Sequence, residues 1–274
     1  MNLSVLLSVY KNEKPNFLSA CLDSLFNSQT LKPDQIILIE DGPLPNNLID
    51  IINKFQHEVG EILIRVKNEK NMGLGYSLNR GLNYCNCKYI ARMDTDDIAI
   101  SSRFEEQVAF MDENPNIDLS GTFSIEIDID GNKGKLRKMP IKDDHIKKCL
   151  WTNPFIHPTV IFKFESLKKV GGYDTNLRRR QDYELWFRCA LNDFIFANLN
   201  KPLLLYRFDE NTHKKQSKEV CKIQAEIGFK GSIDLGLGYI KASLCYFPFL
   251  RSFFPEKIQH IIYKTSKIFD PRSR

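Results

Sequence analysis

The feature that most constrains the fold is an alternation of short apolar runs with helical periodicity along the first 100 residues. Four runs lack internal alternation, which is typical of strands buried on both faces; they span 3–9, 35–39, 61–66 and 88–93. Between them, apolar positions recur at helical spacing in 17–26, 48–55 and 76–84. This order predicts a mostly parallel sheet with right-handed crossovers, and therefore an α/β fold.

The second half of the sequence is less regular. The run 118–129, with its turn at Asp130-Gly131-Asn132, predicts a strand or hairpin. Helices are expected at 103–113 and 181–191, and strands at 157–164 and 202–208. From about residue 218 the pattern changes to helices rich in aromatic residues.

The composition is that of an ordinary globular chain. Hydrophobic residues make up 42% of the 274 residues and charged residues 27%, which excludes a disordered or fibrous protein. The net charge of +5 is concentrated in the C-terminal third and suits an anionic partner such as a nucleotide or a diphosphate. Seven scattered cysteines, no secretory signal and no apolar stretch of about 20 residues predict a reduced, cytoplasmic protein without a membrane span.

Asp94-Thr95-Asp96-Asp97, directly after an apolar strand, is the sharpest chemical signal. Three carboxylates in four residues repel one another unless a cation or solvent neutralises them. Mg²⁺ or Mn²⁺ relieves that repulsion, typically using one or two carboxylates and phosphate oxygens of a substrate. The alternative is a solvated acidic turn that caps the following helix. The preceding buried strand favours the metal site.

Two other strand ends carry groups that can bind a nucleotide. Val9 and Tyr10 end the first strand and offer backbone groups and an aromatic face, and Glu13 follows in the loop. Asp41 ends the second strand and can accept hydrogen bonds from a base or a ribose, although Asp-Gly is also a common turn pair. Because ligands bind beyond the carboxyl ends of parallel strands, we expect one shared site.

The segment Asn71-x-Gly73-x-Gly75 can let the backbone approach a nucleotide closely. It is not a dinucleotide fingerprint, because Leu78 stands where the third glycine would be. Arg80 and Arg92 are nearby cations that can face phosphates or pair with carboxylates.

A second acidic group opens the helix predicted after three successive arginines. Asp182 lies in its first turn, where the helix dipole favours negative charge. A carboxylate there can act as general base toward a sugar hydroxyl, or it can simply stabilise the helix. His157, Arg180 and His213 are candidates for phosphate or acceptor contacts, with a structural role as the default for both histidines.

The order of these groups resembles one family. The matching segments are Ser8 to Glu13, Glu40-Asp41-Gly42, Asn71-x-Gly73, Arg92-x-Asp94-x-Asp96-Asp97, Gly171-Gly172-Tyr173-Asp174 and Gln181-Asp182-Tyr183-Glu184-Leu185-Trp186. In order and spacing over about residues 3–210, the sequence resembles the family 2 glycosyltransferases, including bacterial O-antigen and capsule transferases. Their fold, called GT-A, is a Rossmann-like nucleotide-diphospho-sugar transferase fold with a mostly parallel sheet flanked by helices.

The resemblance implies an inverting, metal-dependent enzyme. It would move a hexose from a nucleotide diphosphate sugar, by default a UDP-sugar, to a polyprenyl-diphosphate-linked sugar acceptor. Asp182 is implied as the general base, although the family often has Glu where this chain has Gln181. Asp94 and Asp96 are implied as ligands of Mn²⁺ or Mg²⁺. The implied donor-binding residues are Val9, Tyr10, Glu13, Asp41, Asn71, Gly73, Arg92, Asp94, Thr95, Asp96 and Asp97.

The resemblance also divides the chain. Residues 1–215 would form the catalytic domain, with a donor half at about 1–100 and an acceptor half at about 101–215. Residues 216–274 would form a helical appendage, whose interleaved aromatic and basic residues suit a membrane surface or packing on the catalytic domain. We expect a cytoplasmic protein, peripheral on the inner membrane, without a nucleic-acid partner. A nucleotidyltransferase and an inactive nucleotide-sugar-binding protein are the alternatives.

Overall fold

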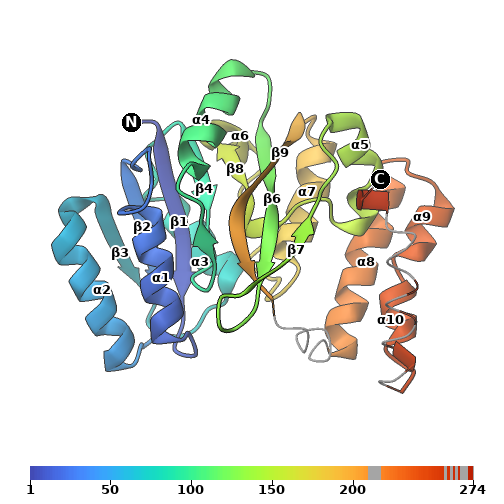
Figure 1. Cartoon of the computed structure of the whole chain (residues 1–274). Helices are drawn as coiled ribbons and strands as arrows, with labels where there is room; N and C mark the ends of the chain where they lie inside the picture. The colour runs from blue at the N-terminus through green and yellow to red at the C-terminus, as the bar shows by residue number, and fades with distance from the viewer. Residues whose placement is uncertain (209–216, 256–257, 260–261, 263–264, 266–270, 274) are drawn as a thin grey trace.

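A computed structural model describes the chain except residues 209–216, 256–257, 260–261, 263–264, 266–270 and 274. Its centre is a nine-stranded sheet in the order β3-β2-β1-β4-β8-β6-β9-β5, with β7 pairing β6 at the side. The strands are β1 Leu3–Val9, β2 Gln35–Glu40, β3 Leu63–Lys67, β4 Tyr89–Arg92, β5 Ile98–Ala99, β6 Leu119–Ile127, β7 Lys133–Arg137, β8 Ile161–Lys163 and β9 Phe196–Arg207. Helices flank the sheet (Figure 1).

The first four strands confirm the predicted parallel sheet. β1 lies between β2 and β4, and β3 follows β2, all in parallel register. The crossover helices are α1 Pro15–Leu25, α2 Asn46–Val59 and α3 Leu74–Leu82. Because strand side chains alternate between faces, Leu7 of β1 joins the core cluster that contains α1 and α2, whereas Leu6 joins the cluster that contains α3.

The second half of the sheet is mixed rather than parallel. β8 runs antiparallel to β4, and β6 runs antiparallel to β8. β9 then pairs in parallel with β6 and antiparallel with β5. The helices of this half are α4 Arg103–Glu113, α5 Asp143–Lys148, α6 Phe164–Lys169 and α7 Gln181–Leu191. The predicted helices at 103–113 and 181–191 and the hairpin after 118 are therefore confirmed.

Two strand predictions need correction. The expected strand at 157–164 is a strand only at β8, because His157–Thr159 forms a 3-10 turn. Pro158 lies in that turn and cannot donate a ladder hydrogen bond. The strand expected at 202–208 begins earlier, at Phe196, because residues 196–199 continue the pairing with β6 across a register shift. The apolar sequence pattern that predicts a strand is interrupted at that shift.

The C-terminal helices pack beside α7. They are α8 Lys218–Asp234, α9 Tyr239–Leu244 and α10 Phe247–Arg251, and they lie together at the right-hand end of Figure 1. A Cβ atom on Gly231 of α8 would lie 2.3 Å from the ring of Phe187, so glycine permits this close approach to α7. No described helix is both long enough and apolar enough to cross a bilayer. The division of the chain at residue 215 stays a prediction, since it falls outside the described residues.

Candidate active site

The strand ends place the predicted acidic groups along one edge of the sheet. Val9 at the end of β1 pairs in register with Glu40 at the end of β2, and the Val9 carbonyl accepts a hydrogen bond of 2.8 Å from the Asp41 amide. On the other side of β1, the Met93 amide after β4 donates to the Leu6 carbonyl. Tyr10, Asp41 and the loop 94–97 therefore follow three neighbouring parallel strands.

The loop after β4 gathers three carboxylates. One oxygen from each of Asp94, Asp96 and Asp97 lies within 4.8 Å of the others. Burial, together with the charges of Asp94 and Glu13, raises the pKa of Asp96 to about 7. Burial and the same charge cluster raise the pKa of Asp97, whose Oδ2 atom has no hydrogen-bond partner. A close group of hard oxygen ligands that repel one another in this way is suited to a divalent cation such as Mg²⁺ or Mn²⁺.

Arg92 lies directly beneath this loop. Its side chain is 3% exposed and forms an ion pair with Asp94, while its Nε and Nη1 atoms are buried and have no hydrogen-bond partner among the described residues. Burial lowers the pKa of Arg92, but the adjacent Asp94 outweighs that effect and leaves the pKa raised. The side chain therefore stays charged, and it retains two unused donors beside the carboxylates.

Two further arginines hold the acidic loop, and the sequence analysis missed both. Arg103 of α4 is fully buried and donates to the Arg92 carbonyl at 2.8 Å. Arg207 at the end of β9 donates through its amide to Asp97 Oδ1 at 2.7 Å and through Nε to the Asp96 carbonyl at 2.9 Å. Neither belongs to a recognisable motif, since one begins a helix and the other ends an apolar strand.

On the other side of the loop, Glu13 accepts a hydrogen bond from the Thr95 hydroxyl. This contact joins the segment after β1 to the segment after β4. The predicted donor-binding residues Glu13 and Thr95 are therefore in direct contact, and Thr95 is buried.

Asp41 organises the loop 68–73. Its Oδ1 atom accepts from the Asn68 side chain and the Met72 amide, each at 2.8 Å. Its Oδ2 atom accepts from the Asn71 side chain at 2.9 Å and the Gly73 amide at 3.0 Å. These four bonds use the acceptor capacity of a carboxylate. The predicted contact between Asp41 and a nucleobase stays a prediction, and in this structure its carboxylate serves the loop.

Gly42 explains how this loop comes so near the end of β2. Its φ of 90° lies in the left-handed region, and a Cβ atom there would lie 2.7 Å from the Asn71 nitrogen. The predicted segment at Asn71 and Gly73 is therefore held against the sheet edge by a glycine and an aspartate.

Asp182 lies in the first turn of α7, as predicted. The helix begins after Arg180, which has a left-handed φ of 66°, an uncommon value for a residue with a side chain. Asn153 donates to Asp182 Oδ2 at 3.4 Å and accepts from the Trp186 indole at 3.0 Å. Trp186 is fully buried. The carboxylate is partly exposed and is held by one long contact.

Tyr173 connects the two acidic regions. Its buried hydroxyl forms a hydrogen bond of 2.9 Å with His157 Nε2. Burial raises the pKa of Tyr173, and Arg92, Asp182 and Asp94 all act electrostatically on it. Tyr173 is therefore close enough to both acidic regions for their charges to act on its hydroxyl. Burial and the nearby Arg92 lower the pKa of His157, so this histidine is neutral at physiological pH.

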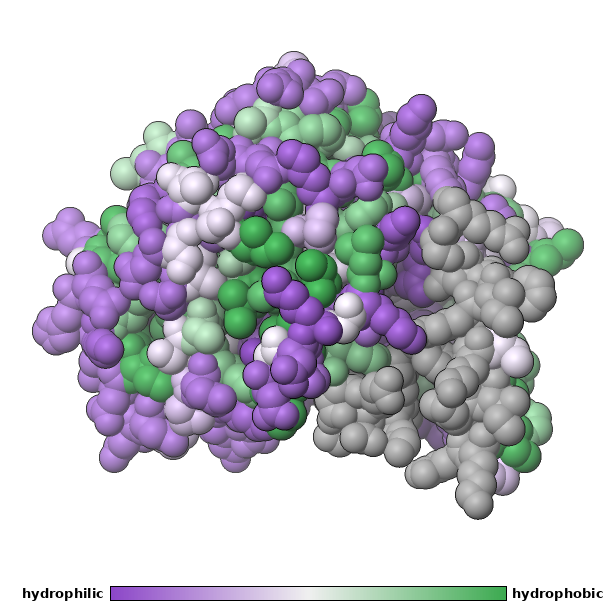
Figure 2. All heavy atoms as spheres, in the orientation of Figure 1, coloured by the Kyte–Doolittle hydropathy of each residue, from purple (hydrophilic) through white to green (hydrophobic). Residues whose placement is uncertain are grey.

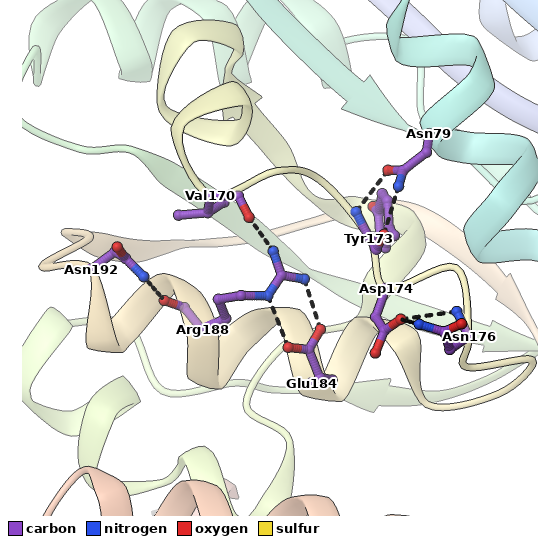
Figure 3. Close-up of polar contacts among 8 residues, drawn as sticks. All are labelled: Asn79, Val170, Tyr173, Asp174, Asn176, Glu184, Arg188 and Asn192. Atoms are coloured by element: carbon purple, nitrogen blue, oxygen red, sulfur yellow. Dashed lines mark hydrogen bonds and ion pairs between the residues drawn. The ribbon is translucent and has the colours of Figure 1, made fainter.

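Figure 3 shows how the segment that carries Tyr173 is fixed. Asn79 of α3 donates to the Tyr173 carbonyl at 2.6 Å and accepts from its amide at 2.7 Å. Glu184 is occupied by a two-pronged contact with Arg188 at 2.7 and 2.8 Å. Asp174 accepts from Asn176 instead. Among the described residues, the Asp182 carboxylate thus accepts one hydrogen bond, whereas those of Asp174 and Glu184 each accept two.

Two candidates remain. Arg180 is half-buried with a buried Nε atom that has no partner. His213 lies outside the described residues.

The arrangement of strands and flanking helices is that of the GT-A class of glycosyltransferase folds, and solved structures share this fold. The S. aureus TarS fragment 1–349 in complex with UDP-GlcNAc superimposes with a TM-score of 0.68 at 18% identity, covering 93% of this chain and 73% of that one. A mannosyltransferase from Pyrobaculum calidifontis in complex with GDP-Man and Mn²⁺ gives a TM-score of 0.64 at 10% identity, covering 97% and 80%. The predicted GT-A fold is confirmed.

The sequence places the chain within one family. Residues 4–171 match the profile described as Glycosyl transferase family 2, and the chain belongs to that family of glycosyltransferases. It is 33% identical over 273 residues to the amylovoran biosynthesis glycosyltransferase AmsE of Erwinia amylovora, covering 96% of this chain and 98% of that protein. It is 33% identical over 233 residues to the UDP-Gal:alpha-D-GlcNAc-diphosphoundecaprenol beta-1,3-galactosyltransferase of Escherichia coli, covering 82% of each.

Proposed function

We propose that the enzyme transfers one hexose from a UDP-sugar to a sugar on a polyprenyl diphosphate lipid, with inversion at the anomeric carbon, in synthesis of a surface polysaccharide repeat unit. The observation that carries this proposal is the convergence of Asp94, Asp96 and Asp97 at the strand edge. The named activity of the Escherichia coli relative, a lipid-diphosphate-linked acceptor and a UDP-sugar donor, supports the substrate classes.

Asp94 and Asp96 would hold Mn²⁺ or Mg²⁺, with Asp97 beside the metal or the sugar. When bound, the ion supplies a Lewis acid that stabilises the negative charge of the departing nucleoside diphosphate. The chain itself fixes the geometry of this site: Arg207 holds the loop from one side and Glu13 from the other. The Arg92 guanidinium places a permanent positive charge beneath the same loop, and its Nε and Nη1 atoms are the two unused donors.

The nucleotide would lie over the ends of β1 and β2. Val9 and Tyr10 offer backbone groups and an aromatic ring that is 45% exposed and so free to stack. Asp41 acts mainly by holding Asn71 and Gly73 in place, so that the backbone of their loop meets the ribose or base.

Asp182 would act as the general base. It accepts the proton of the acceptor hydroxyl as that oxygen forms its bond to the anomeric carbon and the bond to the diphosphate oxygen breaks. One displacement of this kind inverts the anomeric centre. The long contact with Asn153 leaves the carboxylate with acceptor capacity for a substrate hydroxyl.

Two alternatives have less support. A nucleotidyltransferase on a related fold usually carries a Gly-rich activating loop with Arg and Lys near its N-terminus, and the sequence has none. A binding protein without turnover would be favoured by Gln181 in place of the usual Glu, but the acidic triplet is intact.

Calorimetric titration with a panel of nucleotide diphosphates and their sugars, in Mn²⁺ and in chelator, tests the proposal. We expect metal-dependent binding of a UDP-sugar. Equal binding with and without metal would remove the acidic loop from donor recognition. Binding followed by no transfer to any lipid-linked acceptor would favour the binding protein.

A further inference from the structure

The described surface of α9 and α10 is unusually apolar. Among the residues that the structure describes, large hydrophobic side chains are mostly buried elsewhere, yet eight of the fifteen exposed ones fall between 239 and 258. We call these eight the C-terminal apolar face: Tyr239, Ile240, Leu244, Phe247, Leu250, Phe253, Phe254 and Ile258. Figure 2 shows apolar surface at the right-hand edge of the molecule, over these helices.

The exposure is not a sign of loose packing, because the opposite side of α9 is well packed. Ala242 and Cys245 are buried, and Cys245 Sγ lies 3.9 Å from the Ser232 hydroxyl of α8 and 4.0 Å from the Tyr183 hydroxyl of α7. Tyr246 packs edge-on against Phe229 of α8 with ring centroids 5.8 Å apart. The helix therefore has a fixed inner side, and its outer side presents Ile240 at 80% exposure.

The charge of the chain indicates what this face contacts. Residues 217–274 contain ten Lys or Arg and five Asp or Glu, an excess of +5 that equals the net charge of the whole chain. The first 216 residues are therefore neutral overall. Apolar and aromatic side chains in a segment whose sequence carries excess positive charge match the interface of a bilayer that contains anionic lipids. Lys218 illustrates the mixture, since its ammonium lies 4.6 Å from the centre of the Phe253 ring.

We propose that the C-terminal apolar face binds the surface of an anionic phospholipid bilayer. This inference deepens the proposed function, on which its biological purpose rests, by naming the surface that faces the lipid of the acceptor. The geometry is suitable: Tyr183, the neighbour of Asp182, contacts Cys245 on the inner side of α9. The proposed base and the proposed bilayer contact thus lie on directly packed elements.

Sedimentation of the full chain with vesicles tests the inference without any substrate. The vesicles contain phosphatidylethanolamine with phosphatidylglycerol, or phosphatidylcholine alone. We expect binding to the anionic vesicles, weaker binding to the neutral ones, and a decrease with rising salt. The double variant Ile240→Ser/Leu250→Ser should bind at least about tenfold more weakly, because each lost apolar contact is worth roughly 1 kcal/mol or more.

A matched control keeps the result interpretable. Ile129→Ser/Leu136→Ser removes two similarly exposed apolar side chains, at 57% and 47%, from the β6–β7 hairpin, and it should bind vesicles like the unmodified chain. Absent binding to anionic vesicles, or equal loss in both double variants, would overturn the inference. So would a dimer that Ile240→Ser/Leu250→Ser dissociates, with no vesicle binding, because the face would then join two copies. UDP-sugar titration of the double variant separates these outcomes from failure of the proposed function.

Discussion

Asp94 and Asp96 lie two residues apart in one loop, yet their removal should change stability in opposite directions. Asp96 is a carboxyl group whose pKa is raised from 3.8 to about 7 by burial and by neighbouring negative charge. The folded protein therefore holds this proton more tightly than the unfolded chain, and stability falls as pH rises toward 7. Asp94, in contrast, is the ion-pair partner of the buried Arg92.

The magnitudes follow from these environments. Above pH 7 an ionised Asp96 destabilises the metal-free fold by about 4 kcal/mol, and between pH 5 and pH 8 stability should fall by about 2–3 kcal/mol. Asp96→Asn removes the charge at nearly constant volume, so we expect a gain on the order of 2–4 kcal/mol at pH 8. Asp94→Asn leaves the buried Arg92 charge without its ion-pair partner. We expect a loss of about 2–4 kcal/mol of unfolding free energy, because the Arg92 side chain is only 3% exposed.

Thermal and denaturant unfolding in chelator, at pH 5 and pH 8, measures both effects. Asp96→Asn should raise Tm at pH 8 by roughly 5–10 °C, and the gain should shrink at pH 5. It should also abolish metal-dependent donor binding. Asp144→Asn on the exposed side of α5 is the control and should change little. A destabilised Asp96→Asn variant, or a gain that is the same at both pH values, would refute the reasoning.

Three further results are expected. Asp182→Asn should leave donor affinity near that of the unmodified enzyme and slow transfer by at least ~10²-fold in single-turnover kinetics; transfer at normal speed would place the base elsewhere. Arg207→Met should raise the Mn²⁺ concentration needed for half-maximal activity, with partial recovery in Arg207→Lys, because a lysine can still donate to the Asp96 carbonyl; an unchanged metal requirement would contradict a positioning role. Asp41→Ala removes the acceptor of four hydrogen bonds from the 68–73 loop and should lower the unfolding free energy by roughly 2–3 kcal/mol, which denaturant titration will detect; a neutral substitution would mean that the loop is held by other contacts.

The donor half was predictable because its signals are local. A strand buried on both faces produces an uninterrupted apolar run, and β1, β2 and β4 are followed within a few residues by Glu13, Asp41 and Asp94, which a reader of the sequence can see. The carboxylates after β4 are adjacent in sequence, so their clustering required no knowledge of the tertiary structure.

The rest depended on contacts between distant residues. Arg207 reaches the acidic loop across 110 positions, and Tyr173 reaches Asn79 across 94. Nothing near Arg207 in the sequence marks it as different from any polar residue at a strand end. The same limit applies to Asp41: its type and position indicated a ligand contact, and only the folded loop reveals four internal donors. The strand predicted at 202–208 was shorter than β9, because the register shift in the pairing of β9 with β6 interrupts the apolar pattern.

The antiparallel pairing of β4 with β8 has an evolutionary consequence. It is a seam: everything that the proposal assigns to the donor precedes it in sequence, and the proposed base follows it on α7. Specific side chains tie the two sides together: Arg207 of β9 donates to the acidic loop, and Asn79 of α3 donates to the Tyr173 carbonyl. Substitutions beyond β8, other than at Arg207, can therefore re-shape acceptor choice while leaving the proposed donor contacts in place, so a lineage can diversify its polysaccharides one half of an enzyme at a time.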